Sequence, residues 1–246
     1  MKAGHVEPAP RRVRGIIGTE AVFDTIRALY VWEWPHYPQY YIPRADVRMD
    51  LLRTAGDPRE SAHGEAQYYD IAHRLTVRKL AARGVLRPAV AELADHVRFT
   101  WAALDHWLEE DEEVFVHPRD PYTRVDALRS LRKVRIELAG TVLAESSSPV
   151  MLFETGLPAR YYLDRSDVRF EHLTESATRT ACPYKGRTTS YWSASVGATT
   201  LEDVAWSYAF PTREMLPIAG LIAFLNERID VFIDGVEQAR PVTHMS

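Results

Sequence analysis

The chain has 246 residues, of which 46% are hydrophobic and 26% are charged, and its formal net charge at pH 7 is −4. This composition is typical of a soluble globular protein that forms one large domain or two small ones. The acidic balance argues against a general nucleic-acid binder, because such a protein needs a basic surface to offset the charge of the phosphates.

The first half of the chain has the pattern of short strands with one helix. Alternating apolar residues around a turn glycine predict a hairpin that follows an extended, proline-containing arm. An Arg- and Ala-rich stretch predicts an irregular or partly helical excursion. In chain order, the expected elements are the arm 1–10, the hairpin 13–24, strands 30–34 and 40–42, the excursion 72–94, a helix 101–110 and a strand 113–116.

The second half repeats this order more clearly. Apolar residues recur at helical spacing only once in it, and the other apolar segments alternate or carry many aromatic residues, as strands do. Pro118 and Pro121 interrupt regular structure between the two halves of the chain. The expected strands are 134–138, 141–145, 150–153, 161–163, 168–173, 190–194, 204–208 and 229–233, and the expected helix is 216–228.

Internal similarity indicates a tandem duplication. An offset of 121 residues places residues 13–52 on residues 134–173 without a gap and aligns Glu33 with Glu154 and the pair Tyr40-Tyr41 with Tyr161-Tyr162. A second block, residues 101–117, matches residues 218–234 at an offset of 117. Two blocks in the same order predict two copies of one unit. The predicted domains are 11–117 and 131–240, joined by the linker 118–130.

One cysteine, Cys182, excludes an intramolecular disulfide and fits a reducing cytoplasm. The N-terminus lacks the apolar core of a secretory signal. The longest apolar run, residues 216–225, is about half of the ~20 residues that a membrane-spanning helix needs. We therefore expect a soluble, cytoplasmic protein without a membrane partner.

The run Cys182-Pro183-Tyr184-Lys185-Gly186 is the most distinctive motif. Proline and glycine predict a tight turn that fixes the directions of the Tyr and Lys side chains. Lys185 is a candidate cation for a carboxylate or an enolate, or a base if burial lowers its pKa. The alternative is a structural turn with a solvated lysine and a buried thiol. The first copy carries Ser61 to Glu65 here, so this chemistry is assigned to one half.

Glu33 and Glu154 lie at equivalent positions beside aromatic residues. A carboxylate in such surroundings has a raised pKa and can act as an acid or a base. The alternative is a structural glutamate that accepts hydrogen bonds from backbone donors or pairs with Arg44 or Arg165. The duplication favours this alternative, because a structural role is needed in both copies. The proposed catalytic residues are Glu154, Lys185, Tyr162 and Glu33.

The aromatic residues divide between core and pocket. One tyrosine of each pair faces inward from its strand, and several other aromatic residues are candidates for a pocket lining. His36 is an acid–base candidate, although an isolated histidine is more often a surface residue. The proposed substrate-binding residues are Trp34, His36, Tyr37, Tyr41, Tyr184, Trp192, Trp206 and Tyr208.

Several familiar motifs are absent from the sequence. It has neither of the glycine-rich phosphate loops, no nucleophile elbow and no cysteine- or histidine-rich metal motif. The acidic run 109–113 is expected to be a solvated helix end. We therefore predict no cofactor and no metal.

Taken together, the motifs at 134–140, 153–158, 161–163, 182–186, 191–192, 206–208 and 218–224 resemble a bacterial family known as domain of unknown function 427, which is sometimes labelled nucleotidyltransferase-like. The segment 117–122 and the tail 240–243 resemble its tandem form. The resemblance covers nearly the whole chain. It implies a compact β-rich domain with one helix, present twice, and it assigns no activity.

These observations predict a mainly β protein of two small barrel- or sandwich-like domains, each with one α-helix, packed pseudo-symmetrically. The predicted function is a cofactor-independent cyclase or isomerase that acts on a largely apolar, natural-product-like small molecule in an aromatic-lined cavity. A non-catalytic metabolite-binding module is the alternative. A nucleotidyltransferase ranks third, since no phosphate loop or paired-carboxylate metal site supports it. The sequence leaves the oligomeric state open.

Overall fold

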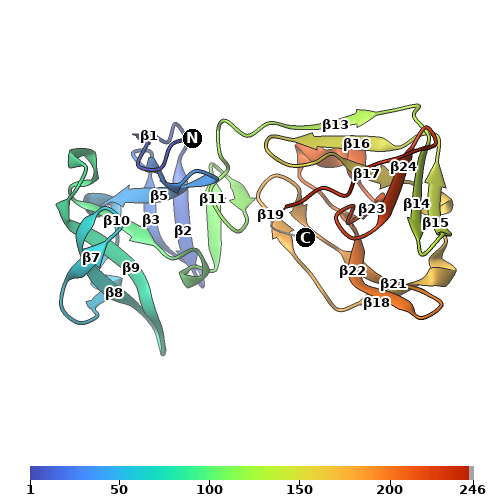
Figure 1. Cartoon of the computed structure of the whole chain (residues 1–246). Coiled ribbons are helices and arrows are strands. Elements are labelled where there is room, and N and C mark those ends of the chain that lie inside the picture. The colour runs from blue at the N-terminus through green and yellow to red at the C-terminus, as the bar shows by residue number, and fades with distance from the viewer. Residues whose placement is uncertain (244–246) are drawn as a thin grey trace. The chain divides into compact units, whose positions relative to one another are not determined.

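Short antiparallel strands form most of the regular structure in residues 1–243, which are the residues that the computed structural model describes (Figure 1). The chain divides into two compact units, Met1–Asp120 (unit 1) and a second unit that begins at Pro121 (unit 2). Each unit contains one large and one small curled sheet. The mainly β fold with two tandem domains, predicted from the sequence, is confirmed.

The large sheet of unit 1 has eight strands. Its order is β1 (Val6–Pro8), β4 (Leu29–Trp34), β5 (Tyr37–Pro43), β10 (His96–Phe99), β9 (Thr76–Pro88), β8 (Gly64–His73) and β6 (Leu52–Thr54), and β7 (Arg59–Ser61) pairs with β8. The small sheet has the order β12 (Glu112–Val114), β11 (His106–Glu109), β2 (Val13–Ile17) and β3 (Glu20–Thr25). Single 3₁₀ turns are η1 (Arg44–Asp46), η2 (Met49–Leu51), η3 (Ala91–Leu93) and η4 (Trp101–Ala103).

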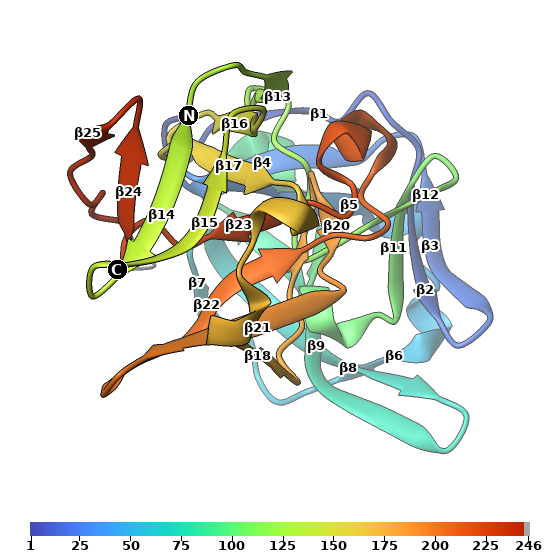
Figure 2. The ribbon, with the colours of Figure 1, turned by 90° about the vertical axis from the view of Figure 1, so that its right-hand side faces the viewer.

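Unit 2 repeats this arrangement. Its large sheet has the order β13 (Val125–Arg129), β16 (Val150–Glu154), β17 (Arg160–Leu163), β23 (Ile222–Phe224), β22 (Thr199–Ser207), β21 (Ser190–Val196) and β18 (Leu173–Ser176). Its small sheet, visible in Figure 2, has the order β15 (Thr141–Ser146), β14 (Val134–Leu138), β24 (Asp230–Ile233) and β25 (Val236–Glu237). The remaining elements are the ribbon β19 (Ala181–Cys182) and β20 (Gly186–Arg187), and the turns η5 (Arg165–Asp167), η6 (Phe170–His172) and η7 (Arg213–Ile218).

The register of the strands confirms the duplication at an offset of 121. Leu29 pairs with Tyr41 in unit 1, and Val150 pairs with Tyr162 in unit 2. A bulge interrupts the first hairpin of each unit at the equivalent point, after Gly15 and after Ile136 in the two units. Since these irregular features recur in register, the two units are copies of one fold.

The second block of the sequence alignment was in the wrong register. In the structure, β11 and β24 are the equivalent strands, because Glu109 pairs with Val13 while Ile233 pairs with Val134. Glu109 is therefore the equivalent of Ile233, which the offset of 117 does not allow. Both segments repeat the same few residue types, such as Ala, Leu and Val, so a comparison in the wrong register still produces several matches.

The two predicted α-helices are wrong. The segment 101–110 contains only one 3₁₀ turn before β11, and the segment 216–228 contains β23, which pairs with β17 and β22. Pro217 removes a backbone donor inside η7, and Gly220 has a φ of +73°, so a helix cannot continue there. In residues 1–243 all helical turns are of the 3₁₀ type, and none of them has the length and apolarity that a membrane span needs.

The predicted arm, linker and excursion all contain strands. β1 lies within the arm and β13 within the linker, and they add to equivalent edges, where Val6 pairs with Val31 and Ala127 pairs with Leu152. The Arg- and Ala-rich excursion forms β9 and part of β8, a long hairpin. A stretch rich in arginine and alanine does not resemble a buried strand, although Ala81 and Ala82 of β9 are buried.

The large sheet of each unit buries residues on both faces, and this positions the site. Tyr40 belongs to the main core of unit 1, whereas Tyr41 belongs to a second, smaller cluster. In unit 2, Tyr161 packs against the main core and Tyr162 belongs to the smaller cluster. Successive residues of a strand point to opposite faces, so each tyrosine pair serves both clusters.

Candidate functional site

In unit 2, the smaller cluster borders a charged pair. Glu154 is the last residue of β16, and Lys185 lies in the turn between β19 and β20. Lys185 Nζ donates a hydrogen bond of 2.5 Å to Glu154 Oε2. The two side chains are 12% (Lys185) and 10% (Glu154) exposed, so the ion pair is largely buried but reaches the surface. The structure thus brings together two of the residues that the sequence proposed as catalytic.

The backbone of the turn explains how Lys185 is held. Gly186 has a φ of +94°, a conformation that glycine adopts without strain. The carbonyl oxygen of Lys185 accepts a hydrogen bond of 3.2 Å from the amide of Thr212, and the Thr212 hydroxyl donates one of 2.6 Å to the carbonyl oxygen of Tyr184. The turn is therefore attached to the segment that follows β22, and the predicted tight turn is present. Its lysine is paired, not solvated.

Tyr162 lies behind the ion pair and is fully buried. Its hydroxyl accepts a hydrogen bond of 3.3 Å from Nε1 of Trp206. Burial raises the pKa of Tyr162 to about 12, although the charge of Lys185 opposes this. Burial also raises the pKa of the neighbouring Tyr208. Both phenols therefore stay protonated at neutral pH.

Lys185 is held in its charged form. Burial by itself disfavours the ammonium, but its interactions with Cys182, Glu154 and Tyr162 outweigh that effect and raise the pKa of Lys185. An ammonium with a raised pKa is a poor base at neutral pH and a suitable partner for negative charge. Of the two roles that the sequence left open for Lys185, the electrostatic one fits this environment.

The equivalent place in unit 1 is built from other side chains. Glu33 Oε1 accepts a hydrogen bond of 2.9 Å from the hydroxyl of Tyr41 and a short one from Arg83 Nη2. Arg83 Nη2 also donates to the Tyr41 hydroxyl over 3.2 Å. Arg98 Nε lies 3.6 Å from the same carboxylate oxygen, and Arg98 Nη2 donates to Gln39 Oε1 over 3.0 Å. Oε1 of Glu33 is thus in contact with Tyr41, Arg83 and Arg98.

His63 stands in unit 1 where Lys185 stands in unit 2. Its carbonyl oxygen accepts a hydrogen bond of 2.9 Å from the amide of Ala89, as that of Lys185 does from Thr212. Gly64, which follows it, has a φ of +104°. The His63 side chain is buried, its ring centroid lies 5.9 Å from that of Tyr41, and its Nε2 has no hydrogen-bond partner. The two halves therefore share this turn, and they differ in the side chain that it carries, which is His63 in unit 1 and Lys185 in unit 2.

Neither glutamate has the arginine partner that was proposed for a structural role. Arg44 donates a hydrogen bond of 3.0 Å to Tyr69, and Arg165 lies over aromatic rings. The partners of Glu33 and Glu154 come instead from distant strands and turns, which the sequence did not identify.

The residues specific to the first copy lie at the end of a hairpin. Trp34 pairs with Tyr37 across the β4–β5 turn, with ring centroids 5.4 Å apart. Tyr37 also stacks on His117 at 3.7 Å. His36 is exposed in the turn itself. Within residues 1–243, His36 has no buried partner that would support the predicted acid–base role.

The remaining aromatic candidates divide between the two faces of the unit 2 sheet. Trp192 packs in the main core, beside Phe170, and so lies away from the face of Tyr162. Trp206 and Tyr208 pack in the smaller cluster with Tyr162. Tyr184 is half-buried in the turn of Lys185.

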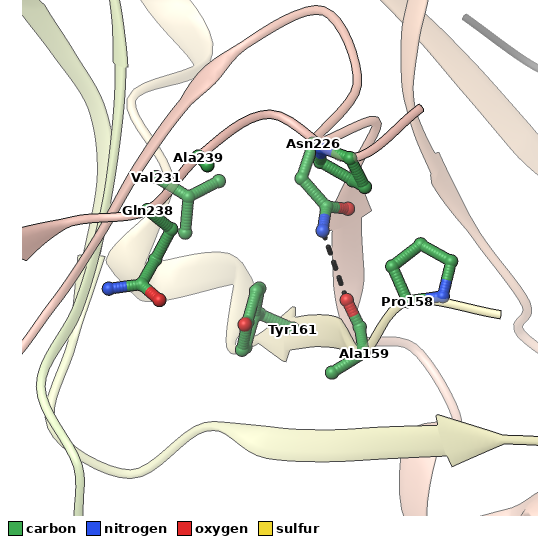
Figure 3. Close-up of a pocket in the computed structure, with 8 residues that line it drawn as sticks. Pro158, Ala159, Tyr161, Asn226, Val231, Gln238 and Ala239 are labelled. Atoms are coloured by element: carbon green, nitrogen blue, oxygen red, sulfur yellow. Dashed lines mark hydrogen bonds between the residues drawn. The ribbon is translucent and has the colours of Figure 1, made fainter. Parts of the chain in front are cut away.

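A cavity of about 130 Å³ in unit 2 lies at a different place (Figure 3). Its lining includes Tyr161 and Asn226, whose Nδ2 donates a hydrogen bond of 3.0 Å to the carbonyl oxygen of Ala159. None of the proposed catalytic residues lines it. Its volume is also below the roughly 300 Å³ at which small-molecule pockets usually begin.

Sequence reasoning assigned no role to three residues of the unit 1 site, namely Arg83, Arg98 and His63. Arg83 belongs to the segment that was expected to form an irregular or partly helical excursion. Arg83 on β9 and Arg98 on β10 are cross-strand partners, and this pairing is not visible in a sequence.

The acidic run 109–113 was expected to be a solvated helix end, and this is wrong for Glu109. Glu109 is buried and accepts a hydrogen bond of 2.5 Å from Tyr40. Within residues 1–243, no three His, Cys, Asp or Glu side chains are grouped to hold a metal ion.

Comparison with known families agrees with the repeat. The model of a family described as Domain of unknown function (DUF427) matches residues 5–110 and residues 126–235, one match in each unit. No curated protein sequence matches the chain.

Proposed function

Because the chain belongs to the domain of unknown function 427 family, whose description names no reaction, we propose a function from the site itself. Unit 2 is an enzyme that transfers protons on a largely apolar small molecule, as an isomerase or a cyclase does. The observation that carries this proposal is the ion pair of Lys185 and Glu154, which reaches the surface in front of the protonated phenol of Tyr162.

The chemistry follows from the charges of these groups. The Lys185 ammonium stabilises the negative charge that develops on a carbonyl oxygen of the substrate. The Glu154 carboxylate takes a proton from the carbon next to that carbonyl and returns it at another carbon, which shifts the double bond without net change in protons. Tyr162 has no exposed surface, so it is a positioning residue that acts through Lys185 and Trp206.

The surrounding side chains support an apolar substrate. Trp206 and Tyr191 are half-buried, and their ring centroids lie 6.2 Å apart. Tyr184 is half-buried beside Lys185. Ligand sites combine such an apolar lining with a few polar groups. The proposed substrate is therefore a natural-product-like intermediate. The single cysteine is compatible with a reducing compartment such as the cytoplasm.

Proton exchange tests the proposal without knowledge of the natural substrate. The full chain is incubated in D₂O with ketones and 1,3-dicarbonyl compounds that carry apolar chains, and deuterium incorporation is followed by NMR. We expect accelerated exchange for the compounds that bind and at least about a tenfold loss in K185M and E154Q. K133M is the matched control, because Lys133 is exposed and pairs with Glu145 in the same unit. Equal exchange rates in wild type, K185M and E154Q contradict the proposal.

A binding module is the second candidate, and one observation favours it. The charges of Lys185 and Glu154 satisfy each other, so a ligand carboxylate that displaces Glu154 would be held without reaction. A compound that raises the melting temperature of the wild type but not of K185M, and that shows no exchange or conversion, identifies this alternative.

A further inference from the structure

The buried cluster of unit 1 contains more positive than negative charge. Arg83 and Arg98 are cross-strand partners on β9 and β10, and both lie within 4.0 Å of Glu33. Each arginine side chain is 16% exposed, and Glu33 is 6% exposed. Two guanidinium groups, which stay charged at all relevant pH values, therefore face one carboxylate.

No other acid neutralises the second guanidinium. In residues 1–243, Glu33 is the only carboxylate within 4.0 Å of a nitrogen of Arg83 or Arg98. The largest electrostatic interactions of Arg98 are those with Glu33, Arg83, Tyr41 and Tyr37, of which only Glu33 carries a carboxylate. A buried, uncompensated charge is costly, so the cluster favours an additional anion.

The cluster also contains buried polar atoms without partners. Within residues 1–243, Nε of Arg83, Nε of Arg98 and Nε2 of His63 have no hydrogen-bond partner, and Nε of Arg98 lies 3.6 Å from Oε1 of Glu33. The His63 residue is only 6% exposed. Most buried polar groups in folded proteins have a partner, and a bound water or ion is one explanation for a group that lacks one.

Unit 2 shows that the fold does not require this charge. Trp206 and Ala223 are the cross-strand pair there, at the positions of Arg83 and Arg98. The hydrogen bond from Arg83 to Tyr41 has its counterpart in the one from Trp206 to Tyr162. Arg98 has no such counterpart, so its charge is an addition of unit 1.

We propose that unit 1 binds a small oxyanion, of the carboxylate or phosphate type, between Arg83 and Arg98 and next to His63. Guanidinium groups hold such anions through paired hydrogen bonds. A carboxylate is the better match in charge, because the cluster has one excess positive charge. This site is separate from the proton-transfer site proposed for unit 2, and the two proposals stand or fall independently.

Titration calorimetry with simple anions tests the proposal on the full chain. The probes are sodium benzoate and inorganic phosphate, with sodium chloride at equal ionic strength as the reference. We expect saturable binding of at least one oxyanion and a loss of about tenfold or more in R98A, since a charge-assisted hydrogen bond to the anion is removed. R98A introduces the alanine that unit 2 has at the equivalent position, Ala223. It leaves the ion pair of Arg83 and Glu33, which has no net charge, in place. R87A is the matched control, because it removes an exposed arginine from β9, the strand that pairs with the strand of Arg98.

A second variant separates binding from folding. E33Q removes the internal competitor for both guanidinium groups, so it should bind the same anion several-fold more tightly than the wild type does. A purely structural role of Arg98 predicts no such gain. Tighter binding of benzoate than of phosphate identifies a carboxylate site, and the reverse order identifies a phosphate site. The proposal is overturned if neither oxyanion binds better than chloride, or if R98A and E33Q bind like R87A.

Discussion

Arg83 and Trp206 occupy the same position of the repeated fold, and each donates a hydrogen bond to the hydroxyl of the equivalent tyrosine. The donor–acceptor distance is 3.2 Å from Arg83 to Tyr41 and 3.3 Å from Trp206 to Tyr162. The scaffold thus conserves a donor to this hydroxyl while the charge of the donor differs. Unit 1 gains its cations from strands of the sheet, whereas unit 2 gains its cation from the turn that contains Lys185.

We expect K185M to destabilise unit 2 by about 3 kcal/mol, because it leaves Glu154 as a largely buried charge without a partner. The double variant E154L/K185M should recover most of this loss, since replacing both members of a buried pair by apolar residues is close to neutral. Urea unfolding measures both effects. Equal stabilities of the single and the double variant contradict the buried pairing.

Alkaline titration should detect the phenol of Tyr162. Its folded pKa of about 12 lies above the ordinary value of 10, so the unfolded state loses its proton first as the pH rises. The stability linked to this group is complete below pH 10 and is lost between about pH 10 and 12. Ultraviolet absorbance of tyrosinate measures the titration. In Y162F, the absorbance change that appears between about pH 10 and 12 should be smaller by the contribution of one tyrosine. An unchanged absorbance change in this pH range contradicts the assignment of the raised pKa to Tyr162.

Mild acid should destabilise unit 1 through His63. Burial lowers the pKa of His63 below 6.5 and Arg83 lowers it further, while Glu33 opposes the shift. Below about pH 6.5 the unfolded chain therefore binds a proton that the folded His63 does not bind, and stability falls toward the folded pKa by at most about 1.4 kcal/mol per pH unit.

Comparison of H63Q with wild type isolates this effect. The free energy of unfolding of H63Q, measured between pH 7.5 and 5, should depend less on pH than that of the wild type. H36Q is the matched control, because His36 lies on an exposed turn of the same unit. A pH dependence of H63Q as steep as that of wild type rejects the role of His63.

The pair of Arg160 and Glu227 should be the most important single ion pair of unit 2. Both side chains are buried, and Arg160 Nη2 lies 2.7 Å from Glu227 Oε1. R160M should lower the stability by about 3–5 kcal/mol, because Glu227 is left as a buried, unpaired charge. R179M, which breaks the exposed pair with Glu175, should cost less than about 0.5 kcal/mol. Similar losses in the two variants, measured by chemical unfolding, contradict this ranking.

Parts of this molecule were predictable because their signals are local. Alternation of apolar residues indicated the strands, and the repeated Glu and Tyr-Tyr positions indicated the duplication. The Pro183 to Gly186 run indicated the turn that holds Lys185. The helices over 101–110 and 216–228 were mispredicted for a physical reason. Short apolar segments fit a helix and a buried strand equally well, and pairing with β17 and β22 decides the outcome for β23.

The sequence by itself determined the family, the two copies, the β character and the residue types from which a site is built. It also singled out Glu33 and Glu154 as positions that the duplication preserves. Only the tertiary structure decided the partners of these carboxylates. Lys185 is 31 residues from Glu154 along the chain, and Arg83 is 50 residues from Glu33. Such pairs depend on the order and register of strands, which form through long-range hydrogen bonds and burial and leave no local pattern in the sequence.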